Sequence, residues 1–344
     1  MFVLGPNQLR RFYQGGAEIA GFRGTGGAQD GPEDWVASTT VAFGEQQAGL
    51  SRLPDGRMLA DAIGQQPAWF LGPEHVAAYG TDTGLLVKLL DAGQRLPVHC
   101  HPDQRYSRAN LGGQHGKTEA WIVLRTSGPD TCVYLGFREE IPATVLARWV
   151  ATQDVAALVG ALHKVPVAPG HSVLVPAGTP HAIGPGVFLA ELQEPTDLSI
   201  LLEWRGFLDD AADAGSLGLG YPRALAAVDR AGWSPARLAG LHRAPAPPGA
   251  GAGITRLLPP AADPFFQAEL LQAGPLRAGV EPGVPAGYAV WVVFSGTGTL
   301  VTEHGGTLPV RRGMTVLVPY ADGAARLSGD VQVIRCLPPR PVTA

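Results

Sequence analysis

The sequence predicts a mainly β protein made of two related barrel-like units, with helices inserted into the first unit. Two observations indicate this fold class. Residues 254–340 alternate short apolar runs with Gly and Pro turns and contain no long helical pattern, which is typical of a sandwich or barrel. Blocks of the N-terminal part also recur in this C-terminal part, which indicates that both units share one fold.

The internal repeat consists of two pairs of blocks. Residues 167–176 (VAPGHSVLVP) align without gaps with residues 310–319 (VRRGMTVLVP). Upstream of these, residues 119–123 (EAWIV) align with residues 289–293 (AVWVV). We therefore expect the two units to place these blocks on equivalent strands.

The first unit is expected to contain helices as well as strands. Apolar positions at helical spacing predict a helical insertion between residues 139 and 164, and residues 52–91 and 222–242 indicate further helices. Residues 84–91 fit a buried strand equally well, because a short apolar run does not separate the two. Strand-like patterns occur at residues 18–22, 119–124, 172–175 and 187–192.

A stretch rich in Pro, Gly and Ala divides the chain. Residues 243–253 (RAPAPPGAGAG) have the composition of a linker. The predicted organisation is a first unit at residues 1–242 that carries the chemistry, the linker at 243–253, and a second unit at residues 254–344. A length of 344 residues agrees with two domains.

The composition excludes several classes of protein. Hydrophobic residues make up 45% of the chain, enough to bury a core and to argue against disorder. The net charge of −4 and the absence of a basic run argue against a nucleic-acid partner. No apolar run of about 20 residues predicts a membrane span. Three cysteines without a CxxC pair, and no visible signal peptide, indicate a reduced, cytoplasmic protein.

Four side chains form a pattern that suits a metal ion. His99 and His101 are two residues apart, so on a strand both side chains point to one face. Glu119 follows at the start of an apolar strand, and a Gly-x5-Pro-x-Gly-x2-His segment ends at His181. Three imidazoles and one carboxylate suit a divalent ion such as zinc, iron, manganese or nickel. We expect these four residues to bind one such ion.

The second unit lacks this pattern. In the alignment of the repeat, Ala289 occupies the position of Glu119, and Ala324 occupies the position of His181. Neither alanine has a side chain that can bind a metal. We therefore expect metal chemistry in the first unit only.

The metal pattern resembles that of the cupin superfamily, whose members fold as double-stranded β-helix barrels. More narrowly, the chain is similar to the type I phosphomannose isomerase family from about residue 6 to residue 207. The similarity rests on residues 88–92 (KLLDA), 98–103 (VHCHPD), 116–121 (GKTEAW) and 175–184 (VPAGTPHAIG). It implies two cupin-type double-stranded β-helix barrels, a bound metal ion that is usually zinc, and interconversion of mannose 6-phosphate and fructose 6-phosphate.

The resemblance also implies roles for individual residues. It assigns metal binding to His99, His101, Glu119 and His181, and proton transfer or substrate polarisation to Lys117 and Glu191. Moving a proton between C1 and C2 requires a base, and a metal ion that polarises the sugar oxygens stabilises the developing charge. Lys117 precedes Glu119 by two residues, so both side chains should share one face of a strand. A neighbouring divalent cation should lower the pKa of this lysine.

The chain departs from the family in two places. The family commonly has Gln where His99 stands, and an imidazole is the stronger ligand. The family also has an Arg on the strand after the position of Asp197, whereas residues 198–204 contain none. Either Arg205 takes over as the catalytic arginine from the end of that strand, or the substrate differs.

Other functions fit the same residues. Three histidines and one glutamate also serve metal-dependent oxygenases, and a sugar-responsive binding protein could keep the fold without turnover. An isomerase of another, unphosphorylated sugar is a further alternative, because no Gly-rich helix start or cluster of cations predicts a phosphate cradle. The sequence does not indicate the oligomeric state.

Overall fold

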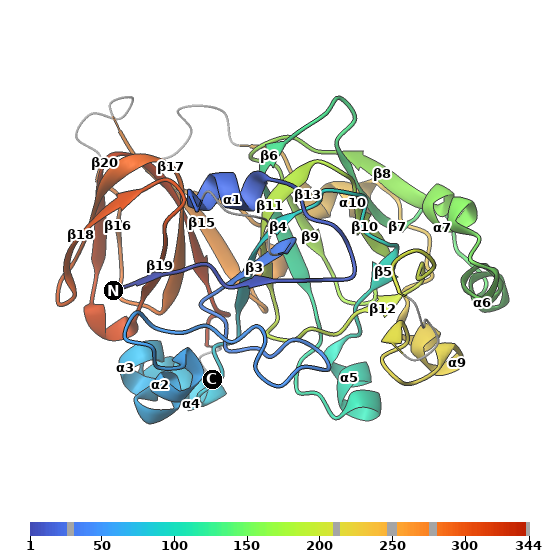
Figure 1. Ribbon diagram of the computed structural model, residues 1–344, viewed down its shortest axis with the longest axis horizontal. Helices are drawn as coiled ribbons and strands as arrows, with labels where there is room; N and C mark the ends of the chain where they lie inside the picture. The colour runs from blue at the N-terminus through green and yellow to red at the C-terminus, as the bar shows by residue number, and fades with distance from the viewer. Residues whose placement is uncertain (26–30, 209–213, 246–252, 275–280, 342–344) are drawn as a thin grey trace.

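The computed structural model describes residues 1–25, 31–208, 214–245, 253–274 and 281–341. Its strands form three sheets of eight, five and seven strands, in which all neighbouring strands pair antiparallel. The prediction of a mainly β fold is therefore confirmed. Figure 1 shows the eight-stranded sheet at one end of the molecule and the other two sheets beside it.

The five- and seven-stranded sheets form the first unit, and their inner faces share one core. The seven-stranded sheet has the order β13 (His242–Arg243), β9 (Ser172–Val175), β6 (Glu119–Thr126), β11 (Val187–Gln193), β4 (Leu86–Asp91), β3 (Glu33–Val36), β2 (Gln8–Leu9). The five-stranded sheet has the order β12 (Ile200–Leu201), β5 (His99–Cys100), β10 (His181–Ile183), β7 (Cys132–Phe137), β8 (Leu162–Pro166). Trp121 and Val173 from the larger sheet pack with Leu135 and Ile183 from the smaller one.

The eight-stranded sheet forms the second unit. Its main path is β1 (Phe2–Leu4), β19 (Thr315–Val318), β17 (Ala289–Thr302), β20 (Ala325–Leu337), β15 (Gln267–Ala273), β14 (Ile254–Arg256), with β16 (Gly283–Val284) beside β20 and β18 (Gly306–Arg311) beside β17. In the described residues beyond 253, the only helical segments are two 3-10 turns, Pro260–Ala262 and Tyr320–Asp322. The N-terminal strand β1 thus belongs to the sheet of the second unit.

The strand register reproduces the repeat that the sequence predicts. Glu119 pairs with Val175 across β6 and β9, and Ala289 pairs with Val318 across β17 and β19. These are the residue pairs that the alignment of the two blocks equates. The predicted equivalence of the blocks is therefore confirmed at the level of individual residues.

A shared apolar layer joins the two units. Side chains alternate along β6, so that Trp121 faces the core of the first unit while Ile122 faces outward. On β17 the outward residues Val290 and Val292 belong to the same cluster as Ile122. The outer faces of the two large sheets therefore bury one another.

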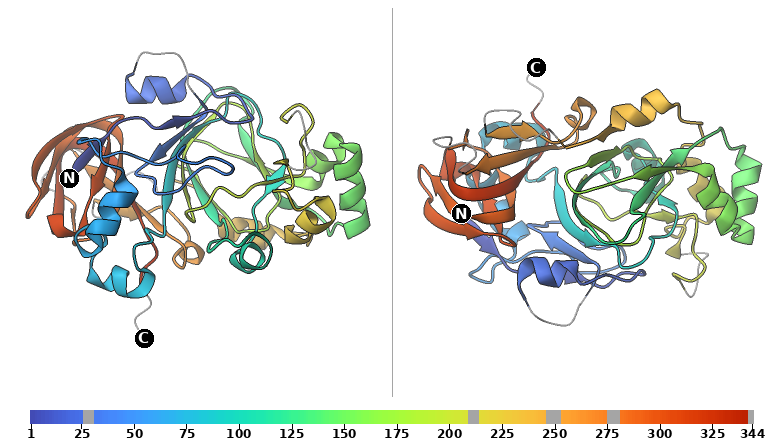
Figure 2. Two further views of the ribbon diagram at one scale, coloured as in Figure 1. Left: turned by 60° about the horizontal axis from the view of Figure 1, so that its bottom comes forward. Right: turned by 90° about the horizontal axis from the view of Figure 1, so that it is seen from above.

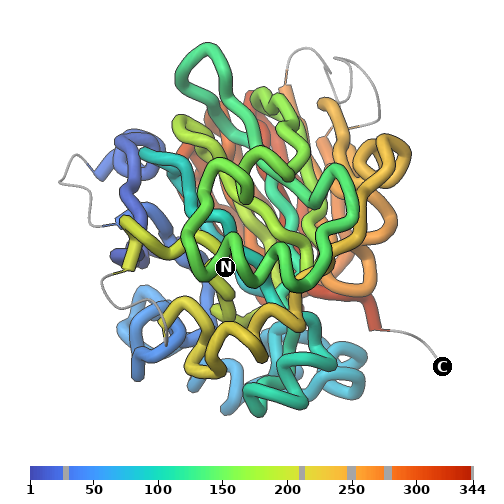
Figure 3. Tube along the Cα trace, turned by 90° about the vertical axis from the view of Figure 1, so that its right-hand side faces the viewer, coloured from blue at the N-terminus to red at the C-terminus, as the bar shows by residue number. Residues whose placement is uncertain are grey.

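Helices surround the sheets much as the sequence predicts. The insertion consists of α6 (Ala143–Thr152) and α7 (Val155–Ala161), which Figure 3 shows at the end of the first unit that faces the viewer. The helices α2 (Leu59–Gln65), α3 (Pro67–Leu71) and α4 (Pro73–Tyr79) follow one another near the second unit (Figure 2). The helix α5 (Gln104–Leu111) starts at Asp103, whose side chain accepts a hydrogen bond from the Tyr106 amide.

Two further predicted segments, residues 84–91 and 222–242, lie within the described residues, and most of the predicted linker does not. Residues 84–91, whose pattern fitted a helix or a strand equally well, contain the strand β4. Residues 222–242 are helical only in part, in α9 (Tyr221–Ala224), the 3-10 turn Leu225–Ala227 and α10 (Pro235–Leu241). Residues 246–252 of the predicted linker lie outside the described residues, so the domain boundaries stay a prediction.

The strand predicted at residues 18–22 is wrong, because these residues form the helix α1 (Glu18–Arg23). The amide of Glu18 donates a hydrogen bond of 2.7 Å to Asp91 Oδ2, so a side chain from β4 satisfies the start of the helix. Ile19 and Phe22 are buried on one face, and Gly24 ends the helix in the left-handed conformation. In the part of the chain that the structure describes, no helix is long and apolar enough to cross a membrane.

Candidate metal centre

Three histidines meet inside the first unit. His99 lies on β5 and pairs with His181 on β10, and His101 follows one residue after β5 ends. The ring centroids are 4.1 Å apart for His99 and His181, 4.8 Å for His101 and His181, and 5.0 Å for His99 and His101. One nitrogen from each ring lies within 4.8 Å of the others, so the three buried histidines are placed to hold a metal ion.

Backbone carbonyls fix the orientation of all three rings. Each ring places Nδ1 2.8 Å from a carbonyl oxygen: His99 at Pro97, His101 at Leu198 and His181 at Thr179. Because a carbonyl only accepts, Nδ1 carries the proton and donates it, which leaves the lone pair on Nε2. This is the tautomer that a metal ion requires.

Glu119 brings its carboxylate to the same point. Its Oε2 lies 3.0 Å from His101 Nε2, and its Oε1 lies 3.3 Å from His181 Nε2. Trp121 Nε1 donates a hydrogen bond of 3.0 Å to Oε1. Among the described residues, His181 Nε2 and Glu119 Oε2 are buried without a hydrogen-bond partner of ordinary geometry. A divalent ion between these atoms would satisfy both, so the donor set fits such an ion.

The electrostatics keep His99 and His101 neutral and Glu119 ionised. Burial, together with the neighbouring His181, holds the pKa of His99 well below its ordinary value. Burial and the ammonium of Lys117 lower the pKa of His101 to about 3. Burial opposes ionisation of Glu119, but Lys117 and His101 outweigh it and hold its pKa well below the usual range. These are the protonation states in which His99, His101 and Glu119 can bind a cation.

Lys117 lies beside these side chains, as the i, i+2 relation to Glu119 predicts. Its Nζ is 3.1 Å from Glu119 Oε2, 2.9 Å from His101 Nε2 and 4.0 Å from Glu191 Oε1. Burial alone would lower the pKa of Lys117, but the carboxylates of Glu119 and Glu191 outweigh it, and the net shift is upward. The sequence predicts a lowered pKa of Lys117 for the case in which a divalent cation is bound beside it. That expectation stays a prediction.

Glu191 is buried between two ammonium groups. It pairs with Lys88 across β11 and β4, and its Oε2 lies 3.9 Å from Lys88 Nζ. Burial and the nearby Glu119 carboxylate raise the pKa of Glu191 well above its ordinary value. A carboxyl group with a raised pKa can exchange protons near neutral pH, which is a property of general acids and bases.

Lys88 is held by an ion pair and by an aromatic ring. Its Nζ lies 3.3 Å from Glu33 Oε2 and 4.6 Å from the centre of the Trp35 ring. Lys88 also lines the small cavity at the candidate metal centre.

The structure does not bring Arg205 to the site. Its side chain is exposed and lies over the ring of Trp204, 5.6 Å from the ring centre. The backbone N–H groups of Trp204 and Arg205 donate to Gln153 Oε1, which holds this segment against the helical insertion. Arg205 is not among the residues that line the cavity at the candidate metal centre.

The arginine that lines this cavity is Arg11, which sequence reasoning missed. It lies 3.0 Å from Asp197 Oδ1 and 3.4 Å from Glu33 Oε1, and its guanidinium group is largely buried. The adjacent pair Arg10 and Arg11 was the only signal in the sequence, and nothing in the spacing connects it to the metal pattern.

Two cavities meet at Arg11. The cavity beside the metal-binding residues has a volume of about 30 Å3, which is room for a water molecule but not for a sugar. A neighbouring cavity of about 240 Å3 shares Arg11, Phe12, Asp197 and Ser199 with it and is also lined by Arg10. The ion pair of Arg11 and Asp197 therefore forms part of the wall between the two cavities.

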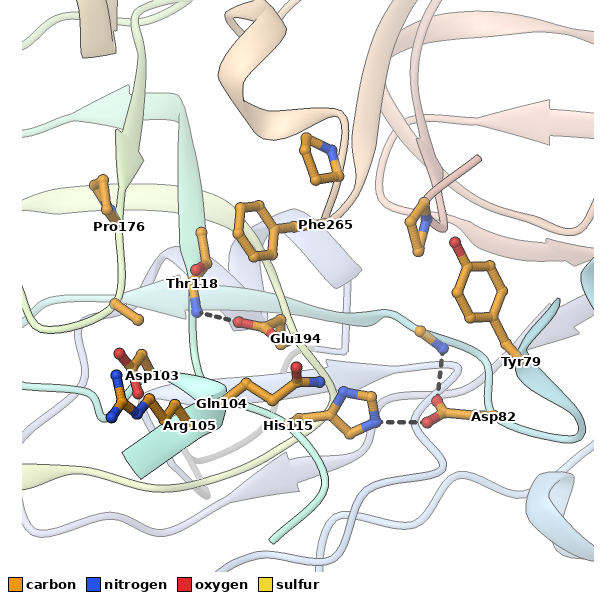
Figure 4. Close-up of a pocket in the computed structure, with 14 residues that line it drawn as sticks. Tyr79, Asp82, Asp103, Gln104, Arg105, His115, Thr118, Pro176, Glu194 and Phe265 are labelled. Atoms are coloured by element: carbon orange, nitrogen blue, oxygen red, sulfur yellow. Dashed lines mark hydrogen bonds and ion pairs between the residues drawn. The ribbon is translucent and has the colours of Figure 1, made fainter. Parts of the chain in front are cut away.

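A larger cavity of about 550 Å3 lies on the other side of β6 (Figure 4). It contains His115, whose Nε2 lies 2.5 Å from Asp82 Oδ2, and Glu194, which accepts a hydrogen bond from the Thr118 amide. The hydrogen bond with Asp82 raises the pKa of His115 above its ordinary value. The three metal-binding histidines do not line this cavity, so His115 belongs to a separate place in the fold.

Comparisons with known proteins place the chain among isomerases by similarity. Over 195 residues it is 30% identical to mannose-6-phosphate isomerase ManA from Bacillus subtilis, covering 55% of this chain and 56% of that protein. Over 128 residues it is 35% identical to mannose-6-phosphate isomerase from Streptococcus mutans, covering 36% of this chain and 39% of that protein. The chain thus spans about half the length of the curated relatives it matches, or less. No protein-family model matches the chain.

The fold extends the similarity over the whole chain. The crystal structure of the mannose 6-phosphate isomerase from Bacillus subtilis superposes with a TM-score of 0.70 at 20% identity, covering 97% of this chain and 98% of that one. The resemblance that the motifs predict is therefore confirmed: part of the chain is similar in sequence to mannose-6-phosphate isomerases, and the chain has the fold of a solved mannose 6-phosphate isomerase.

Proposed function

We propose that the protein is a metal-dependent aldose–ketose isomerase that interconverts mannose 6-phosphate and fructose 6-phosphate. One observation carries the proposal. Three histidines with their Nδ1 protons donated to carbonyls converge with Glu119 on one point, and Lys117 and Glu191 line the same cavity. The curated relatives carry the name of this activity.

The proposed ligands of the metal ion are His99, His101, Glu119 and His181, and the proposed ion is zinc. When bound, it would act as a Lewis acid on the oxygens of C1 and C2. His99 and His101 are neutral, and the carboxylate of Glu119 is the ligand that would partly neutralise the ion. The hydrogen bond from Trp121 to Glu119 holds the carboxylate in place for this task.

Glu191 is the proposed base of the reaction. Proton transfer between C1 and C2 requires a group that takes a carbon-bound proton and returns it to the neighbouring carbon. Its raised pKa favours this exchange near neutral pH, and Lys88 and Lys117 stand on either side of its two oxygens. Lys117 is the proposed hydrogen-bond donor to the sugar oxygens, because its ammonium reaches both Glu191 and the metal ligands.

Arg11 is proposed to take the role that was assigned to Arg205. It carries the only guanidinium group that lines the small cavity within the described residues. In the proposal, the substrate enters through the 240 Å3 cavity and separates Arg11 from Asp197, since the inner cavity has no room for a sugar. Arg10 in the outer cavity is the proposed contact of the phosphate group.

The finer description of the fold belongs to the same proposal. We propose that both units are cupin-type double-stranded β-helix barrels, one at residues 1–242 and one at residues 254–344. The shared register of the repeat supports this, as does the similarity to a solved mannose 6-phosphate isomerase.

Proton-exchange NMR tests the function. The metal content of the purified protein is measured first, and mannose 6-phosphate, mannose and fructose 6-phosphate are then incubated with it in deuterated water. We expect deuterium at C1 or C2 of the phosphorylated sugars and fast conversion between them. Exchange in free mannose alone would favour an isomerase of an unphosphorylated sugar, and oxygen consumption with bound iron would favour an oxygenase.

A further inference from the structure

The second unit contains a large cavity of its own. It has a volume of about 520 Å3, within the range of small-molecule sites. Its walls come from β15, β20 and the segment before β17, and α3, α4 and the last described residues close one side. Figures 1 and 2 show these helices next to the eight-stranded sheet. The cavity is distinct from the candidate metal centre, with which it shares no lining residue.

Each unit contains a row of three residues that pair across adjacent strands, and the two rows carry different charges. In each unit three residues pair side by side across adjacent strands: Lys88, Glu191 and Trp121 in the first, and Glu269, Arg335 and Trp291 in the second. Directly paired residues lie on the same face of a sheet. Arg335 therefore occupies the place of the proposed base Glu191, and it lines the cavity together with Glu269.

The same comparison of the two rows explains why the indole N–H group of Trp291 lacks a hydrogen-bond acceptor. In the first unit Trp121 Nε1 donates to Glu119. In the second unit Ala289 occupies the position of Glu119, and among the described residues Trp291 Nε1 has no hydrogen-bond partner. Trp291 is 1% exposed, so its N–H has lost water without gaining an acceptor.

Two other buried donors without a partner line the cavity itself, which Trp291 does not. Tyr288 is 2% exposed and its hydroxyl group has no hydrogen-bond partner among the described residues, and the same holds for Nε of Arg335, which is 5% exposed. The other guanidinium nitrogens of Arg335 donate to Glu269 at 3.0 Å and to the Pro285 carbonyl at 3.3 Å. One edge of the guanidinium group is thus left for an acceptor. Buried polar groups usually have partners, so these donors require an explanation.

The charges around the cavity define the ligand further. Arg335 and Arg340 both line it, and so do the carboxylates of Glu269, which pairs with Arg335, and Glu74. The two free donors of the lining, one of them on a guanidinium group, suit a group that accepts hydrogen bonds, such as a carboxylate. Gln267 and Tyr320 add polar side chains for hydroxyl groups.

We propose that the second unit binds a small hydroxylated carboxylate, such as a sugar acid, with its carboxylate group at Arg335 and Tyr288. The carboxylate accepts hydrogen bonds from the free edge of the guanidinium group and from the phenol. The proposal does not depend on the isomerase activity of the first unit.

Isothermal titration calorimetry of the full chain with glucuronate as the probe tests this site. Glucose, which lacks the carboxylate, and inorganic phosphate, which lacks the sugar, are titrated in parallel. We expect glucuronate to bind at one site and both comparison ligands to bind at least about tenfold more weakly. No heat with glucuronate, or equal affinity for glucose or phosphate, would overturn the proposal.

Substitutions locate the binding. Because the Tyr288 hydroxyl has no partner, Tyr288→Phe should leave the unfolding temperature unchanged or higher, yet weaken glucuronate about tenfold. Arg335→Gln should abolish glucuronate binding, but it also leaves the carboxylate of Glu269 without its partner. If the Arg335→Gln variant does not fold, the affinity of Tyr288→Phe for glucuronate tests the proposal instead. Tyr106→Phe, which removes a phenol in the first unit, is the matched control. An unchanged affinity in Tyr288→Phe would refute the site.

Discussion

The two units place different polar side chains on one strand framework. Trp121 and Trp291 sit at the same register and both are buried, so the framework around them is the same. In the first unit the neighbouring polar atoms are lone pairs of imidazole and carboxylate groups, whereas in the second they are N–H and O–H donors. The first arrangement attracts a cation and the second an acceptor. The fold therefore does not determine the chemistry; the inward side chains do.

The comparison also shows that the fold does not require the metal ligands. Ala289 replaces Glu119 in the second unit, and its strand still pairs in the same register with β19. The strands are held instead by alternating apolar residues, which are Val, Leu, Ile and Trp in both units. Substitutions of the polar inner residues should thus change chemistry more than they change folding.

The largest expected effect comes from His181→Ala, which makes the first unit resemble the second at this position. The variant loses one of three imidazoles, so we expect no bound metal and no turnover above background. Metal analysis and the isomerase assay measure both. His304→Ala, an exposed histidine of the second unit, is the control and should keep both. Full metal occupancy in His181→Ala would show that His181 is not a metal ligand.

Lys117→Ala separates metal binding from catalysis. The lysine is not one of the proposed ligands, so the variant should keep its metal. Turnover should fall by about 10²- to 10⁴-fold, because a group that assists proton transfer typically accelerates a reaction by this factor. Metal analysis and kcat report the two properties independently. The exposed Lys164→Ala is the matched control. A near-normal kcat would remove Lys117 from the mechanism.

Arg11→Ala and Arg205→Ala distinguish the two candidate arginines. Removal of the buried Arg11 should lower kcat/KM about 10- to 100-fold, as expected when a hydrogen bond to a charged group is lost. Removal of the exposed Arg205 should change kcat/KM by about twofold or less. The reverse order of the two effects would restore Arg205 as the catalytic arginine.

The smallest expected effect concerns His115, which lies outside both inner faces. Its pKa is raised in the folded state, so the stabilisation is present at low pH and is lost as pH rises through the folded-state value. The pKa of Asp82 is lowered, so its share is lost as pH falls through the folded-state value. His115→Gln should therefore destabilise by about 1 kcal/mol or less near pH 5 to 6 and not at all near pH 9.

Urea unfolding at the two pH values measures the effect of His115→Gln. Because this histidine is outside the inner faces, the metal content and glucuronate affinity should stay unchanged. A loss of metal in this variant would mean that the cavity in Figure 4 and the metal centre are coupled.

Local patterns in the sequence predicted which side chains converge at the candidate metal centre. His99 and His101 share a face because of strand geometry, and Glu119 and Lys117 do so for the same reason. The repeat predicted which residues pair in the second unit, since register follows from the apolar pattern. These features depend on neighbours along the chain or on the duplication, so they are visible without a structure.

The remaining features depend on contacts between distant segments. Arg11 lines the cavity at the candidate metal centre, where it pairs with Asp197, 186 residues further along the chain. Arg205 was predicted from its place after a strand, but Gln153 in the helical insertion holds its backbone away. Residues 18–22 form a helix because Asp91, on a different element, accepts the amide hydrogen bond at its start. No pattern within these segments predicts such partners.

The strand β1 has a consequence for how the second unit is protected. Phe2–Leu4 covers the outer edge of β19, whose backbone would otherwise present unpaired N–H and C=O groups. A fragment that starts at residue 254 would therefore expose a ready template for pairing with another chain. We expect such a fragment to self-associate, and a synthetic peptide of residues 1–6 to suppress that association by occupying the open edge.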